Sequence, residues 1–311
     1  MSSIPFTEKY RPNKLENIIL DPYNRKILEN IVNTSYFPNL LFYGPPGTGK
    51  TTSCISLINA YQEKLGQKGK DLIIHLNASD ERGIDIIRNQ INQFVNSKTL
   101  FTTGMKFVIL DEVDYMTKNA QQALKYLLQS YNSGIRFCLI CNYISRIDEG
   151  LQNEFLRLRF NQLPENDIIL FLENISTNEK LNFSKKVLYQ IQKLYKSDVR
   201  SMINYMQTNQ NIIDSELNVI DSSIWEELYS NISNSNIPLQ SLIDFIDNVS
   251  IKYNIDKKNI MKDFFNYIIR SKEVTNNPYF FNFVENCMHI EDCNTRYLTN
   301  YSLIKMRELF S

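Results

Sequence analysis

The sequence has 311 residues, of which 43% are hydrophobic, and it carries 34 basic and 34 acidic side chains. A chain of this length is too long for one ordinary hydrophobic core, so we expect two or three domains. The charge balance excludes a general polycation that would hold nucleic acid over its whole surface. Because no apolar stretch approaches 18 residues and no secretory leader is visible, we expect a soluble, intracellular protein without a membrane partner.

Residues 1–164 carry 19 basic and 15 acidic side chains, and residues 165–311 carry 15 and 19, so a modest positive bias lies in the first half. Five scattered cysteines do not form a disulfide framework and fit a reducing compartment. Cys138 and Cys141 fall inside one apolar run without a second Cys/His pair, so we interpret them as buried thiols rather than zinc ligands. The solitary His75 and His289 are assigned structural roles.

The first half alternates apolar runs with helical patterns. Residues 40–43, 72–76, 107–110 and 137–141 are typical of buried parallel strands, and segments such as 51–65 and 120–131 are typical of the helices between them. This alternation predicts an α/β fold with a doubly wound parallel sheet.

A complete G-x-x-x-x-G-K-T loop follows the first predicted strand and opens a predicted helix. Such a loop turns backbone N–H groups toward phosphate oxygens, while its lysine reaches the β and γ phosphates of a nucleotide and its threonine holds Mg²⁺. We therefore predict ATP and Mg²⁺ as ligands; a chance glycine-rich turn is the alternative. The predicted nucleotide-binding residues are Gly44, Pro45, Pro46, Gly47, Thr48, Gly49, Lys50, Thr51 and Thr52.

Acidic residues end the third predicted strand, at the sheet edge where the loop also opens. Asp111 is predicted to hold Mg²⁺ together with Thr51, and Glu112 to orient the water that attacks the γ-phosphate. Asn142 follows the next strand, where its amide could bond the γ-phosphate or the attacking water; an ordinary strand-end turn is the alternative.

After Pro164 the strand signals disappear and amphipathic helical patterns follow, at 167–176, 184–195, 200–209 and 221–230. A polar, turn-prone stretch at 230–238 then separates a last helical region. We predict three domains: the α/β ATPase domain at 1–164, an all-α lid at 165–232 and an all-α C-terminal domain at 233–311.

Several sequence boxes together resemble the small subunits of replication factor C, the sliding-clamp loader of the AAA+ class. They are EKYRP at 8–12, NASDERGI at 77–84, DEVD at 111–114, RFCLICNY at 136–143 and SDVR at 197–200, in the order and spacing of that family. The resemblance covers residues 5–210. It implies that the C-terminal domain is a collar joining five subunits into an open ring that loads a sliding clamp onto primer-template DNA.

The resemblance also implies roles for single residues. Tyr10, Arg11 and Pro12 match the segment that wraps the adenine, Arg200 matches the lid arginine that senses the γ-phosphate, and Asn142 matches the strand-end sensor. Arg82 and Arg88 match a helix that follows DNA phosphates; a solvated helix face is the alternative.

One position departs from the family. Where most small subunits have a Ser-Arg-Cys arginine finger that reaches the neighbouring subunit's ATP, this chain has Glu154. An acid cannot stabilise the negative charge that develops during phosphoryl transfer. Either the neighbouring site does not hydrolyse ATP, or Arg157 or Arg159 substitutes.

The leading function is therefore a DNA- and clamp-stimulated ATPase subunit of a clamp loader, acting in the nucleus or at a viral replication site. The missing finger keeps open a structural or regulatory ring subunit that binds ATP with little turnover. A third alternative is another AAA+ ATPase that works on DNA, such as a branch-migration motor.

Overall fold

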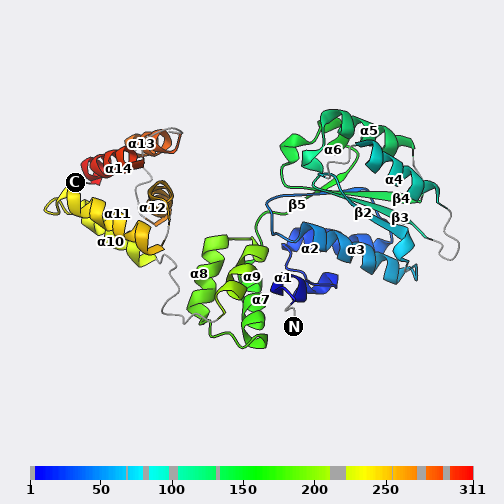
Figure 1. Cartoon of the computed structure of the whole chain (residues 1–311), viewed down its shortest axis with the longest axis horizontal. Helices are drawn as coiled ribbons and strands as arrows, with labels where there is room; N and C mark the ends of the chain where they lie inside the picture. The colour runs from blue at the N-terminus through cyan, green and yellow to red at the C-terminus, as the bar shows by residue number, and fades with distance from the viewer. Residues whose placement is uncertain are drawn as a thin grey trace. The chain divides into compact units, whose positions relative to one another are not determined.

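The computed structural model describes residues 4–67, 69–79, 84–97, 104–130, 134–210, 222–253, 255–271, 278–289 and 295–310. The chain divides into two compact units, residues 1–212 and 213–311. Figure 1 draws both units. Among the described residues, buried hydrophobic side chains form two cores in the first unit and one in the second.

The first unit begins with an α/β domain built on one five-stranded parallel sheet of order β2-β3-β4-β1-β5. Its strands are β1 (Leu40–Tyr43), β2 (Ile73–Asn77), β3 (Lys106–Asp111), β4 (Ile135–Cys141) and β5 (Leu156–Arg159). Its α-helices are α1 (Phe6–Lys9), α2 (Pro22–Thr34), α3 (Lys50–Lys64), α4 (Ile84–Asn96), α5 (Lys118–Ser130) and α6 (Glu149–Gln152). Short 3₁₀ turns are η1 (Leu15–Asn17), η2 (Lys70–Leu72), η3 (Val113–Tyr115) and η4 (Ile144–Arg146). The four strands expected from sequence are confirmed within one residue at most ends; β5 was not predicted.

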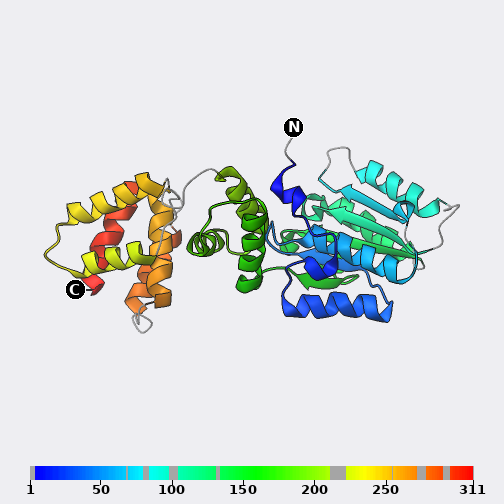
Figure 2. The ribbon, with the colours of Figure 1, turned by 90° about the horizontal axis from the view of Figure 1, so that it is seen from below.

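The sheet separates two hydrophobic cores because successive strand side chains point to opposite faces. Leu40 and Phe42 of β1 pack with α2 and α3 on one face, whereas Leu41 packs with α4 and α5 on the other. Figure 2 views the sheet from the side of α2 and α3, which lie in front of the strands. This three-layer arrangement leaves the carboxyl ends of the strands open for a site.

Three helices complete the first unit: α7 (Glu165–Asn178), α8 (Lys185–Tyr195) and α9 (Val199–Thr208). We call them the lid. Side-chain caps define two of their starts, because Ser184 accepts from the Val187 N–H and Asp198 accepts from the Ser201 N–H. The lid contacts α1 through a hydrogen bond from the Phe6 N–H to Gln207 Oε1 of 2.9 Å.

The second unit is all-α in its described part. It contains α10 (Ser222–Ser233), α11 (Leu239–Tyr253), α12 (Lys257–Ser271), α13 (Pro278–His289) and α14 (Thr295–Phe310). Leu228 and Ile232 of α10 are fully buried in the core of this unit. The structure therefore groups α10 with the C-terminal helices, whereas the sequence expectation of a boundary at 232 grouped it with the lid. The polar loop after α10 was mistaken for a domain linker, although it is a helix connection inside one core.

None of the helices in the described ranges is both long enough and apolar enough to cross a membrane.

Candidate nucleotide site

The loop between β1 and α3 wraps around the ammonium group of Lys50. The Nζ atom donates to the carbonyl oxygens of Gly44 at 2.7 Å and Pro45 at 2.8 Å. Gly44 cannot be replaced without moving backbone, since a Cβ there would lie 1.7 Å from the carbonyl oxygen of Phe160. Burial lowers the pKa of Lys50 to about 8, although the negative charge of Asp111 opposes this shift.

Asp111 ends β3 directly opposite the start of α3. Its Oδ2 accepts a hydrogen bond from Thr51 Oγ1 at 2.8 Å, and its Oδ1 accepts from the Glu112 N–H at 2.9 Å. His75 Nε2 lies 3.7 Å from Oδ2. Burial alone would raise the pKa of Asp111, but the nearby His75 imidazole and the hydrogen bonds from Thr51 and the Glu112 N–H outweigh it and lower that pKa below its ordinary value. The carboxylate is therefore held in its charged form.

His75 is a residue of the site that the sequence analysis missed, because it was assigned an ordinary structural role. The available signal was its place on β2, two residues before the strand end and on the strand that pairs with β3. Strand alternation puts the side chains of positions 109 and 111 on the same face as His75.

Glu112 is held in an uncommon backbone conformation. Its φ of 58° lies in the left-handed region, which costs a residue with a side chain about 1–2 kcal/mol. The residue lines the same cavity as Lys50 and Asp111. Strain of this kind persists only where the surroundings fix the backbone, and it concentrates at functional sites.

Asn142, the first residue after β4, faces the loop. Its Oδ1 accepts a hydrogen bond from Lys50 Nζ at 2.9 Å. Because a lysine ammonium can only donate, this contact fixes the amide with its oxygen toward Lys50 and leaves the Nδ2 group as a donor at the other side.

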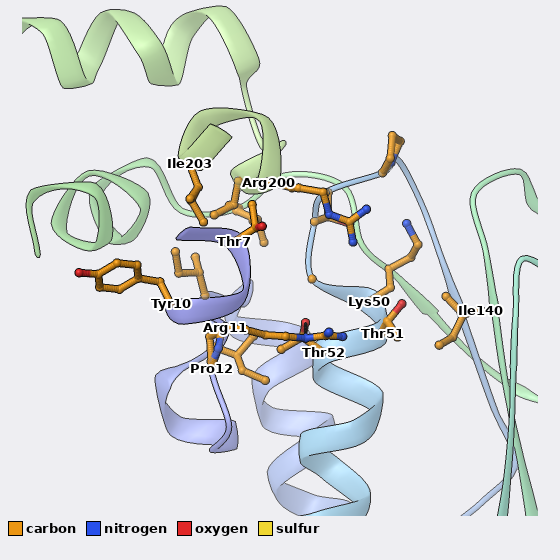
Figure 3. A pocket seen from close by; sticks show the side chains of 18 of the residues that line it. Thr7, Tyr10, Arg11, Pro12, Lys50, Thr51, Thr52, Ile140, Arg200 and Ile203 are labelled. Atoms are coloured by element: carbon orange, nitrogen blue, oxygen red, sulfur yellow. Dashed lines mark hydrogen bonds between the residues drawn. The ribbon is translucent and has the colours of Figure 1, made fainter. Parts of the chain in front are cut away.

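These groups share a cavity of about 350 Å³ between the loop, the N-terminal segment and the lid (Figure 3). The predicted residues that line it are Tyr10, Arg11, Pro12, Pro46, Gly47, Thr48, Gly49, Lys50, Thr51, Thr52, Asp111, Glu112, Asn142 and Arg200. Gly44 and Pro45 shape the loop without lining the cavity. Ile18, Ile19, Leu163, Phe171 and Ile203 add an apolar wall that no motif marked in advance.

The lid and the N-terminal segment are both tied to this cavity. The Val199 N–H, at the start of α9, donates to the Gly47 carbonyl oxygen at 3.1 Å. On the other side, Glu179 at the end of α7 accepts from the Tyr10 hydroxyl and forms an ion pair with Lys9 at 2.6 Å. Burial and the hydrogen bond with Glu179 raise the pKa of Tyr10 to about 12. The N-terminal segment, the phosphate loop and the lid, which are far apart in sequence, thus surround the same cavity.

The two remaining sequence predictions concern DNA. Arg82 lies outside the described residues. Arg88 lies on α4, whose backbone is described at that position but whose side chain is not. Both stay predictions.

The donor set fits a small hard cation. Thr51 Oγ1 and the Asp111 carboxylate lie 2.8 Å apart, and oxygen ligands of this kind are those that Mg²⁺ takes at nucleotide phosphates. The deprotonated state of Asp111 agrees with that use.

Comparison with known proteins assigns the class. Residues 40–163 match the model of the ATPase family associated with various cellular activities, AAA. A RuvB of Thermotoga maritima has the same fold, with a TM-score of 0.50 over 86% of this chain and 93% of that one, at 12% sequence identity. The fold, the glycine-rich loop and the acids that follow β3 agree with this match, so the first unit contains a nucleotide-binding P-loop domain of the AAA+ ATPases.

Within that class, the chain is related to the small subunits of replication factor C. It is 36% identical over 206 residues to replication factor C subunit 3 of Schizosaccharomyces pombe, covering 66% of this chain and 59% of that protein. It is 38% identical over 207 residues to subunit 5 of Homo sapiens, covering 66% and 60%. It is 39% identical over 206 residues to the small subunit of Sulfurisphaera tokodaii, covering 66% and 62%. The matched region thus spans about three fifths of these relatives.

Proposed function

We propose that this chain is a small subunit of a clamp-loader complex that uses ATP binding and hydrolysis to open a sliding clamp and load it onto primer-template DNA. The observation that carries the proposal is the convergence of Lys50, Asp111, Glu112 and Asn142 on one cavity, in a chain related to replication factor C small subunits. The other ring subunits, the clamp and the DNA are proposed partners.

Each side chain has a definite part in the proposed reaction. Lys50 contacts the β and γ phosphates, and its burial strengthens its attraction for them because little water screens the charge. Thr51 and Asp111 would hold Mg²⁺, which would supply charge neutralisation on the phosphate oxygens. Glu112 orients the attacking water, Asn142 donates from Nδ2 to the γ-phosphate or that water, and Arg200 reaches the γ-phosphate from the lid.

The adenine would lie between the N-terminal segment and the lid. Tyr10, Arg11 and Pro12 line that end of the cavity together with apolar residues such as Ile18 and Ile203. Apolar walls with a few polar groups are typical of sites that accept a planar base.

Glu112→Gln tests the proposal in the reconstituted complex with clamp and primer-template DNA. We expect the variant to bind ATP with unchanged affinity, because the amide keeps the shape of the side chain, and to lose stimulated hydrolysis. Turnover equal to that of the parent protein would contradict the assignment of Glu112 and the enzymatic part of the proposal.

A second candidate, a structural or regulatory ring subunit that binds ATP with little turnover, is favoured by Glu154. This acid is exposed just after α6, with its Oε1 3.5 Å from Gln129 Nε2. Arg157 and Arg159 are exposed on the edge strand β5, and Arg157 Nη1 lies 3.4 Å from Gln152 Oε1. If Arg157→Ala and Arg159→Ala each leave the ATPase rate of the complex unchanged, neither arginine substitutes for the finger.

The proposed DNA contact of Arg88 has a separate test. A phosphate contact contributes about 0.9 to the slope of log affinity against log salt concentration. Arg88→Ala should therefore weaken DNA-stimulated hydrolysis and reduce the slope of log DNA affinity against log salt concentration by about one. An unchanged slope would contradict the proposed phosphate contact.

A further inference from the structure

Asp114 is a buried acid for which the proposed reaction has no role. It lies in η3, three residues after Asp111, and only 5% of its surface is exposed. It does not line the nucleotide cavity. Burying a carboxylate is costly unless hydrogen bonds compensate, so its contacts decide what it does.

The Oδ2 atom of Asp114 accepts two backbone hydrogen bonds, from the Asn142 N–H at 3.3 Å and from the Tyr143 N–H at 3.2 Å. Both residues lie just beyond β4, where the neighbouring strand β1 ends at Tyr43. An amide that runs past the end of its sheet has no strand partner and must find another acceptor. Asp114 is that acceptor.

These two bonds act on the backbone that carries Asn142, whose side chain reaches Lys50 at 2.9 Å. They join the turn after β3, which follows Asp111 and Glu112, to the segment after β4. The position of the Asn142 amide relative to the two acids therefore depends on Asp114.

We propose that Asp114 is a positioning residue for ATP hydrolysis, holding the end of β4 so that the Asn142 amide meets the γ-phosphate and the attacking water. This inference rests on the proposed function, because it assumes that the site turns over ATP. It assigns Asp114 an effect on the catalytic rate, exerted only through Asn142, and little effect on nucleotide affinity.

A double-mutant cycle in the reconstituted complex tests it, with kcat for ATP and the Kd of ATP measured for each variant. We expect Asp114→Ala to lower kcat about 10- to 100-fold, since a displacement near 1 Å can cost that much, while Kd changes less than threefold. Asp114→Asn keeps an acceptor oxygen of the same reach and should recover most of the rate. In the Asn142→Ala background, Asp114→Ala should lower kcat by less than twofold further.

Asp21 provides a matched control, because its Oδ1 accepts two backbone hydrogen bonds of similar length, from Tyr23 at 3.1 Å and Asn24 at 3.0 Å. Asp21 does not line the cavity, so Asp21→Ala should reduce thermal stability and leave kcat within twofold. If Asp114→Ala does not fold, Asp114→Ser takes its place in the cycle, because its hydroxyl is too short to hold both amides.

Equal losses of kcat for Asp114→Ala in the parent and in the Asn142→Ala background would overturn the inference and assign the acid a general structural role. Failure of the proposed function gives a different result. In that case the parent complex and Glu112→Gln would show the same turnover, whatever the residue at position 114.

Discussion

The contact between the phosphate loop and the lid leads to a quantitative prediction for Gly47→Ala. Gly47 has φ +72°, and a Cβ built on it would lie 1.7 Å from Asp198 Oδ1 and 3.2 Å from Asp198 Cα. The left-handed backbone costs alanine about 1–2 kcal/mol. In addition, Asp198 must move. Its Oδ1 accepts a hydrogen bond of 3.0 Å from the Ser201 N–H that caps α9, and this bond would be lost. Losing such a cap costs about 0.5–2 kcal/mol.

Gly66→Ala separates the cost of the left-handed backbone from the cost of displacing Asp198. Its φ of +66° is close to that of Gly47, but nothing lies within 4 Å of a Cβ built there. Gly66→Ala should therefore lower only the free energy of unfolding, whereas Gly47→Ala should also displace the lid from the loop. The cost of the left-handed backbone is common to both variants, so the difference between them is the cap loss of about 0.5–2 kcal/mol. Because every 1.4 kcal/mol is a factor of ten, we expect ATP to bind about 2- to 30-fold more weakly to Gly47→Ala than to Gly66→Ala.

The assay is titration with a fluorescent ATP analogue, together with urea denaturation of both variants. Equal nucleotide affinity of the two variants would refute the reasoning, because it would show that the lid does not rest on the loop at Gly47 when nucleotide binds.

Three further predictions concern single side chains. Lys106 is 9% exposed and donates to the carbonyl oxygens of Phe94, Val95 and Ser97 at the end of α4. Lys106→Met should therefore lower the free energy of unfolding by about 2–4 kcal/mol in a denaturant titration. Lys26→Met, at an exposed position, is the control, and equal effects of the two substitutions would contradict the capping role of Lys106. Glu179→Gln removes the charged partner of Lys9 and Tyr10 and should lower the free energy of unfolding by about 1–2 kcal/mol. Glu173→Gln, in the ion pair with the exposed Lys185, should have a smaller effect. Hydrogen bonds from Lys9 and Tyr10 lower the pKa of Glu179 below its ordinary value, so its contribution is present above pH 4.5 and is lost as the pH falls through the pKa of the folded state. Lys50, whose pKa is about 8, should take up a proton when phosphates bind at pH 8.5, so the affinity for ATP should fall as the pH rises through 8. Calorimetry at pH 8.5 in two buffers of different ionisation enthalpy should therefore give different heats of binding. Identical heats would contradict the uptake of a proton by Lys50.

The sequence was sufficient for those parts of the site that depend on short-range pattern. A glycine-rich loop after an apolar strand and acids after a second one can be placed at the same sheet edge by topology alone. The strand at 40–43 was predicted at its observed bounds. Lys50, Thr51, Asp111, Glu112 and Asn142 line one cavity, and their roles toward nucleotide and metal stay predictions.

What the sequence did not reveal depends on long-range packing. β5 has exposed residues at three of its four positions, so it lacks the apolar run that marks a buried strand. The contact of His75 with Asp111 needs the pairing of β2 with β3, and the contact of Glu179 with Tyr10 joins positions 169 residues apart. The grouping of α10 with the last helices follows from Leu228 and Ile232, whose burial no local pattern assigns to one core or the other.

The absence of a side chain at Gly44 has a mechanical consequence. A Cβ there would overlap the carbonyl group of Phe160, so the first residue of the phosphate loop rests directly on the strand exit that leads to the lid. Side chains can rotate away from a moving neighbour, but main-chain atoms cannot. The first residue of the phosphate loop and the segment that leads to the lid therefore pack main chain against main chain, and neither can move toward the other at this point.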